Sequence, residues 1–173
     1  MTSNISKELL ELKAAYSDAL WAWAQVEAWL FVIFFEAHGG QDETFEYLQE
    51  TFFSVVSFEL RLTMTHNVAK MRWEKHRLLE MWQHIYKKCE KENRTRGKFA
   101  HLVGDVYLPN SPNEKPLAVL IRPYFHPRRP QTLALAKVEG YQANALLECA
   151  HRWNELSVEI HYLSNLAQPP TQP

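Results

Sequence analysis

An arginine and a histidine in this chain are spaced so that both side chains could contact one phosphate. Arg96 and His101 are five positions apart, with Gly97 directly after the arginine. On one uninterrupted α-helix, an offset of five residues turns the second side chain about 140° past a full turn, so the two would not share a face. A helix that ends near Gly97, a common stop residue, would let His101 turn back toward Arg96. Both side chains could then contact a single anion.

The two side-chain types suit phosphodiester chemistry, but they also have structural uses. A histidine, whose ordinary pKa is about 6.5, can accept the proton of a ribose 2′-OH or protonate a leaving oxygen. An arginine can hold two phosphate oxygens and stabilise the charge of a transition state. A histidine at a helix end can equally cap carbonyls or bond across a dimer interface, and an arginine can bind a carboxylate such as that of Glu27. The spacing leaves both interpretations open.

The stretch from Arg96 to His101 resembles the signature of the HEPN superfamily (higher eukaryotes and prokaryotes nucleotide-binding), an arginine followed after four to six residues by a histidine. In that family the signature lies on and just after a late helix of an α-helical bundle. Many members are metal-independent endoribonucleases that act as homodimers, often as toxins or in defence systems. Active members usually carry a polar residue, often Asn, after the arginine, whereas this chain has Gly97. The resemblance says little about residues 105–138.

The resemblance implies roles for named residues. Arg96 and His101 would be the catalytic pair of an endoribonuclease that leaves 2′,3′-cyclic phosphate ends and needs no metal or cofactor. Arg94, which is also the alternative catalytic arginine, and Lys98 would add phosphate contacts. Supporting positions behind them would be Glu27 and Asn93. Apart from the resemblance, the basic charge of the middle segment makes Arg128 and Arg129 further expected phosphate or RNA contacts.

The partners implied by the resemblance are RNA or a nucleotide, a second copy of the chain, and an antitoxin protein. The alternative function, from a different class, is a non-catalytic helical homodimer that acts as a scaffold or binds a ligand or partner. Convergence of Arg96 and His101 in an open basic cleft would favour the ribonuclease. Burial of both against protein groups would favour the scaffold.

Charge is distributed unevenly along the chain, although the net charge is only −1. Residues 1–60 carry a net −8, residues 61–130 carry +9 and residues 131–173 carry −2. The basic middle contains the arginine–histidine stretch and could attract phosphates. A solvated helix end followed by a soluble loop would give the same pattern.

Other chemistries find little support in the sequence. There is no Gly-rich phosphate loop, no CxxC, no HExxH and no pair of histidines four residues apart. The two cysteines, Cys89 and Cys149, fall on apolar helical positions and are expected to be reduced core residues, as in a cytoplasmic protein. No metal site is predicted. The N-terminus lacks signal-peptide character.

Apolar periodicity predicts the elements that must position these residues. Helices are expected over residues 5–37, 43–65, 68–94 and 142–167, with a break near residues 65–67. Strands are expected over residues 103–108 and 117–121, with a third short strand over 132–138. The predicted fold is an all-α bundle of four to five helices with a small β-hairpin or sheet before the last helix. A single domain would cover residues 1–167, with its β insertion at about 103–138, and residues 168–173 would be a disordered tail.

The run 19–37 is nearly long enough and apolar enough to cross a membrane. Gln25 and Glu27 lie in its middle, and a carboxylate inside a bilayer is costly. We therefore expect a helix buried in a core or dimer interface and no membrane attachment. Glu27 either faces a cleft or pairs with a basic residue of the middle segment, or it points outward through a gap in the apolar surface.

Overall fold

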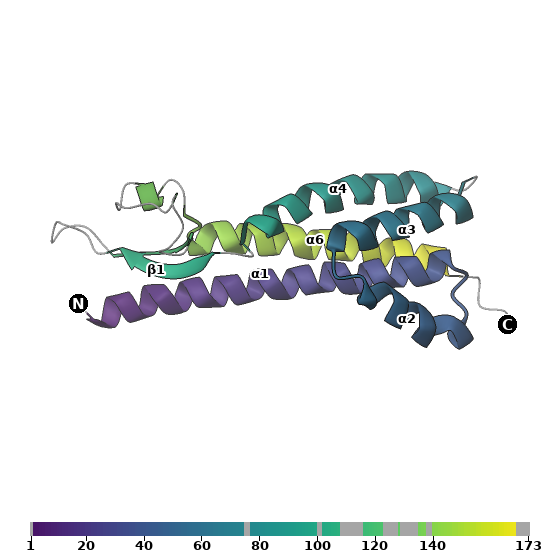
Figure 1. Ribbon diagram of the computed structural model, residues 1–173. Helices are drawn as coiled ribbons and strands as arrows, with labels where there is room; N and C mark the ends of the chain where they lie inside the picture. The colour runs from purple at the N-terminus through teal and green to yellow at the C-terminus, as the bar shows by residue number, and fades with distance from the viewer. Residues whose placement is uncertain are drawn as a thin grey trace. The chain divides into compact units, whose positions relative to one another are not determined.

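A computed structural model describes residues 2–74, 77–99, 102–107, 116–122, 128, 135–137 and 140–168. The chain is mostly helical, and an antiparallel β-hairpin precedes the last helix (Figure 1). The predicted helical bundle with a β insertion before its last helix is thereby confirmed.

The chain divides into two compact units. The hairpin unit comprises Met1–Ala22 and Thr95–Arg152, and the helical unit comprises Trp23–Arg94 and Trp153–Pro173. Each passage from one unit to the other occurs inside a helix. The three helices concerned are α1 (Thr2–Ala37), α4 (Arg77–Phe99) and α6 (Ala143–Ala167).

The sheet of the hairpin unit joins β1 (Val103–Tyr107) to β2 (Leu117–Ile121) in antiparallel register. Tyr141 extends the pairing, because it exchanges two backbone hydrogen bonds of 2.9 Å with Leu120. The positions of both strands agree with the prediction. The expected third strand is wrong at residues 135–137, which are helical. The rest of that segment, residues 132–134 and 138, lies outside the described residues.

A small apolar core of the hairpin unit is built on β2. Val119, Ile121 and Ala136 are almost fully buried in it. Gly140 closes against this core so tightly that a β-carbon there would lie 2.6 Å from the carbonyl oxygen of Ala136. Only glycine fits that position without a shift of the backbone.

In the helical unit, α2 (Phe45–Ser54) follows a 3₁₀ turn and leads into α3 (Phe58–Arg72). The predicted single helix over 43–65 is therefore wrong, and so is the predicted break at residues 65–67. The chain leaves the helical conformation at Val55, and Ser57 starts the next helix by accepting a hydrogen bond from the Leu60 amide at 3.4 Å.

The apolar periodicity predicted for residues 142–167 is confirmed. The predicted single helix over 68–94 is wrong, because α3 ends at Arg72 and α4 begins at Arg77, and the apolar Met71 is 83% exposed. In α4 the buried positions include Leu78, Trp82, Ile85 and Cys89. In α6 they are Leu146, Cys149, Trp153, Leu156, Ile160 and Leu163. Both cysteines are free thiols, and burial raises the pKa of Cys89 to about 12, which makes it an unreactive core residue.

The segment Ser6–Ala37 of α1 is long and apolar enough to cross a membrane by length and composition, and half of its most apolar window is buried within the protein. Core helices of soluble proteins meet the same criterion. The helix ends at Gly39 and Gly40, whose φ angles are +109° and +60°. The Gly40 amide donates to the Phe35 carbonyl at 3.1 Å, a closure that needs the left-handed backbone glycine allows.

Candidate functional site

The predicted catalytic stretch begins on the last turns of α4. This helix continues through Arg96 and Gly97 and ends at Phe99, later than the predicted stop. Phe99 is 1% exposed and its ring meets that of Tyr141 edge-on at 4.7 Å, so packing fixes the helix end in the hairpin unit. The Leu102 amide then donates to the Phe99 carbonyl at 3.1 Å. His101 lies outside the described residues, and its position relative to Arg96 stays a prediction.

Arg96 and Lys98 are the basic residues of the last turn of α4. Arg96 is half-buried, Lys98 is exposed, and neither forms an ion pair with another residue in the described part of the chain. The last carbonyls of a helix carry partial negative charge, which these two cations offset. An anion at this end would therefore be held by the side chains and not by the helix itself.

The structure divides the remaining predicted residues between the two units. Arg128 belongs to the hairpin unit with Arg96 and Lys98, is exposed, and accepts a hydrogen bond of 2.9 Å on its backbone carbonyl from Arg122. Asn93, Arg94 and Glu27 belong to the helical unit. Arg129 lies outside the described residues.

Glu27 is held by protein groups. Its carboxylate accepts one hydrogen bond of 2.9 Å from Arg61 and another of 2.7 Å from the indole of Trp23. The Arg61 guanidinium also lies over the ring of Phe52, at 5.5 Å. Glu27 thus pairs with a basic residue of the middle segment, which was one of the two alternatives. These contacts indicate a structural role for the Glu27 carboxylate.

Sequence reasoning did not single out Arg61, although a signal was present. Arg61 falls on the inner face of α3, between the buried residues Phe58 and Leu62 and one turn before Thr65. A basic residue on such a face needs a carboxylate partner. The apolar periodicity of a single helix over residues 43–65 favours Leu60 and Met64 as its inner positions, and position 61 was therefore missed.

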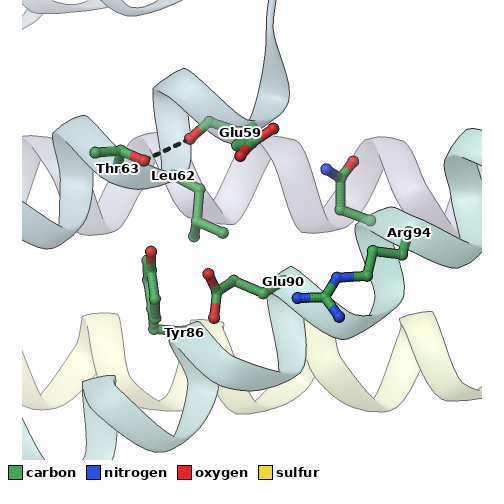
Figure 2. A pocket seen from close by; sticks show the side chains of 7 residues that line it. Glu59, Leu62, Thr63, Tyr86, Glu90 and Arg94 are labelled. Carbon is green, nitrogen blue, oxygen red and sulfur yellow. Dashed lines mark hydrogen bonds between the residues drawn. The ribbon is translucent and has the colours of Figure 1, made fainter.

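Asn93 and Arg94 line a polar pocket of about 120 Å³ in the helical unit, together with Glu59, Leu62, Thr63, Tyr86 and Glu90. Figure 2 shows Tyr86, Glu90 and Arg94 reaching from α4 toward the space that faces α3. Burial, and then the charge of Glu90 and a hydrogen bond with its carboxylate, raise the pKa of Tyr86. The ring of His66 also packs against that of Tyr86, and the two ring centroids lie 4.3 Å apart.

The lining of this pocket can both donate and accept hydrogen bonds. Two carboxylates and two hydroxyls accept, whereas a guanidinium, an amide and the hydroxyls donate. The volume is somewhat below that of the engineered cavity, about 150 Å³, that binds benzene. The pocket can therefore hold a few waters or one polar group smaller than a benzene ring. Glu59, Thr63 and Tyr86 were not expected here, because the pocket depends on how α3 lies against α4.

A metal centre is not formed by the described residues, among which no group of three or more His, Cys, Asp or Glu side chains is placed to hold an ion.

No protein-family model, curated protein or solved structure matches the chain. The resemblance to the HEPN superfamily therefore stays an expectation that rests on the residue types and spacing of Arg96 and His101.

Proposed function

We propose that the protein is an HEPN-like, metal-independent endoribonuclease of the cytoplasm, of the kind that toxins and defence systems use. The observation that carries this proposal is the state of Arg96. It lies on the last turns of α4, is half-buried, and has no ion-pair partner in the described segments. A guanidinium that has no carboxylate partner is suited to a phosphate.

The proposed reaction is a transesterification within the RNA strand. The ribose 2′-oxygen loses its proton and attacks the adjacent phosphorus, the bond from phosphorus to the 5′-oxygen breaks, and a proton reaches that leaving oxygen. The products are a 2′,3′-cyclic phosphate and a 5′-hydroxyl end. His101 is the proposed proton-transfer group and Arg96 the stabiliser of the charged transition state. Lys98 is a further phosphate contact.

The test is cleavage of a mixed RNA pool in EDTA by the wild type, Arg96→Ala and His101→Ala. We expect cyclic phosphate ends from the wild type, and a loss of about 100-fold or more from each variant, the size typical of a lost acid–base or electrostatic group. Arg96→Lys keeps the positive charge but loses the bidentate hydrogen-bonding geometry, so it should retain only part of the wild-type cleavage rate.

Matched controls separate the site from general effects. Arg72→Ala and His84→Ala remove an exposed arginine and an exposed histidine outside the proposed site, and both should cleave like the wild type. Circular dichroism must show that every variant folds. Absence of cleavage by the wild type would refute the ribonuclease, and equal cleavage by the Arg96 and His101 variants would refute the site.

The polar pocket favours a second candidate, a non-catalytic module that binds a small ligand. Its carboxylates and Arg94 could bind the donor and acceptor edge of a nucleobase, as these side chains do in base recognition. Calorimetric titration of the protein with each of the four nucleosides tests this function. We expect Glu90→Gln and Arg94→Ala to weaken binding, whereas Arg72→Ala should not. An absence of heat with all four would rule it out.

A further inference from the structure

An open pocket of about 410 Å³ lies between α4 and α6, within the helical unit. Two contacts hold the helices together beside it. The Lys88 ammonium donates to both carboxylate oxygens of Glu159, at 2.6 and 2.8 Å, and the Trp153 indole donates to Glu92 at 2.8 Å. From these contacts the pocket extends toward the start of α4. Its volume falls in the range of about 300–1,000 Å³ that is usual for small-molecule sites.

The apolar part of the pocket lining comes from both helices. On α4 it is formed by Ile85, which is 4% exposed, and by the half-buried Met81. On α6 it is formed by Tyr162, which is 58% exposed. A thioether together with an aromatic ring makes an adaptable apolar surface. The hydrophobic effect therefore favours an apolar group of a ligand at this surface.

The charged part of the lining contains one group that is already paired and two that are not. The Glu159 carboxylate is neutralised by Lys88. Arg77 and Glu80 are exposed, and neither forms an ion pair with another residue in the segments that the structure describes. They stand three positions apart on α4, so their β-carbons lie about 5–6 Å apart on one face of the helix. The pocket therefore presents one positive and one negative group beside an apolar surface.

We propose that this pocket binds the zwitterion of a free α-amino acid with a large apolar side chain. The ligand carboxylate accepts hydrogen bonds from the Arg77 guanidinium, and the ligand ammonium donates to the Glu80 carboxylate. The ligand side chain covers the apolar surface on Met81 and Tyr162. A zwitterion satisfies both charges of the pocket, whereas a simple anion or cation would leave one of them facing a like charge. The inference does not depend on the proposed ribonuclease.

The experiment is calorimetric titration of the full chain with L-phenylalanine and three analogues that each lack one feature. Phenylalaninamide lacks the carboxylate, N-acetylphenylalanine lacks the ammonium, and glycine lacks the apolar side chain. We expect phenylalanine to bind and each analogue to bind about 10-fold more weakly or worse, the loss that follows removal of a charge-assisted hydrogen bond or of apolar contact. Titrations at two temperatures detect binding whose enthalpy is near zero at one of them.

Two variants assign the two polar contacts. Arg77→Ala should weaken the binding of phenylalanine about 10-fold and leave that of phenylalaninamide unchanged, because the amide lacks the carboxylate that Arg77 would bind. Glu80→Gln should weaken the binding of phenylalanine and leave that of N-acetylphenylalanine unchanged. Arg72→Ala and Glu74→Gln are the matched controls, because they remove exposed charges that do not line the pocket. Both should bind phenylalanine like the wild type, and circular dichroism checks that each variant folds.

An absence of heat at both temperatures with phenylalanine, and also with leucine and tryptophan, would overturn the proposal. Equal binding of phenylalanine and its amide, or of phenylalanine and its N-acetyl derivative, would overturn recognition of the zwitterion. Binding of phenylalanine that survives both Arg77→Ala and Glu80→Gln without loss would show that the amino acid does not bind in this pocket.

Discussion

Gly97 occupies a helical position that does not require glycine. A β-carbon at this position would have no neighbour within 4 Å, and its φ angle is not positive. Because alanine is favoured over glycine in a helix, we expect Gly97→Ala to raise the free energy of unfolding by about 0.5–1 kcal/mol. Urea denaturation measures the change. In the proposed ribonuclease Gly97→Asn should also be tolerated and should increase cleavage, and a loss of folding in either variant would contradict the open environment.

The Glu27–Arg61 pair illustrates a charge that serves the fold. The Arg61 side chain is 9% exposed and that of Glu27 is 22% exposed, so each is costly to leave alone. We expect Arg61→Ala to lower the free energy of unfolding by about 1–3 kcal/mol, the cost of a buried group left unsatisfied. In a double-mutant cycle, Arg61→Ala with Glu27→Ala should cost less than the sum of the single changes. Additive costs would show that the two residues act independently.

His66 gives the helical unit a pH-sensitive element. Burial first, and then the charge of Lys70, lower the pKa of His66, although Glu90 opposes them. The unfolded chain therefore binds this proton at a higher pH than the folded one. The stability from neutral His66 is present above the ordinary value of 6.5 and is lost as pH falls through the folded pKa. We expect the urea midpoint to drop as the pH falls from above 6.5 through the lowered pKa of folded His66, and to drop less in His66→Gln. An equal drop in both proteins would exclude His66.

At the scale of elements, the start of α3 depends on one side chain. The Ser57 hydroxyl is the cap acceptor for α3, and no other side chain of the described residues caps that end. We expect Ser57→Ala to lower stability by about 1 kcal/mol, whereas Ser57→Asp should be neutral or stabilising because aspartate caps as well. Thermal unfolding compares the two. Equal midpoints for Ser57→Ala and the wild type would show that the cap contributes little.

The helices that sequence reasoning located well are those with a continuous stripe. In α6 every third or fourth residue from Leu146 to Leu163 is apolar, and each of these positions is buried. The α2–α3 break escaped because Val55 and Val56 continue the apolar pattern across it. The break depends on the capping residue Ser57 and on which side chains of α3 are buried. Arg61 and Leu62 are buried there, whereas Leu60 is 58% exposed.

The candidate site was only partly predictable for a similar reason. Residue types and spacing are enough to select Arg96 and to expect it near a helix end, because both are local properties. The pocket around Tyr86 and Glu90 and the pairing of Glu27 depend on which helices lie side by side, and that is decided by packing over the whole unit.

At the scale of the whole molecule, the two units share three helices and no loop connects one to the other. A helix that frays in one unit removes hydrogen-bonded turns from the other, so unfolding should be cooperative. Leu146 is fully buried in the hairpin unit, and we expect Leu146→Ala to cost about 2–5 kcal/mol. Fluorescence reports mainly on the helical unit, because all tryptophans but Trp21 lie there. With cooperative unfolding, Leu146→Ala should lower the unfolding midpoint by the same amount in circular dichroism and in fluorescence. A fluorescence midpoint that stays at the wild-type value would show independent unfolding.

This arrangement has a consequence for biosynthesis. The first segment of the hairpin unit leaves the ribosome with residue 22, but its partners begin only at residue 95, and the helical unit is complete only once residues after 153 have appeared. Neither unit can close until residues 95–152 and the segment after residue 153, respectively, have been synthesised. The apolar residues of α1 are therefore exposed in the nascent chain for longer than those of any later helix, and α1 is the segment on which a ribosome-associated chaperone would act first.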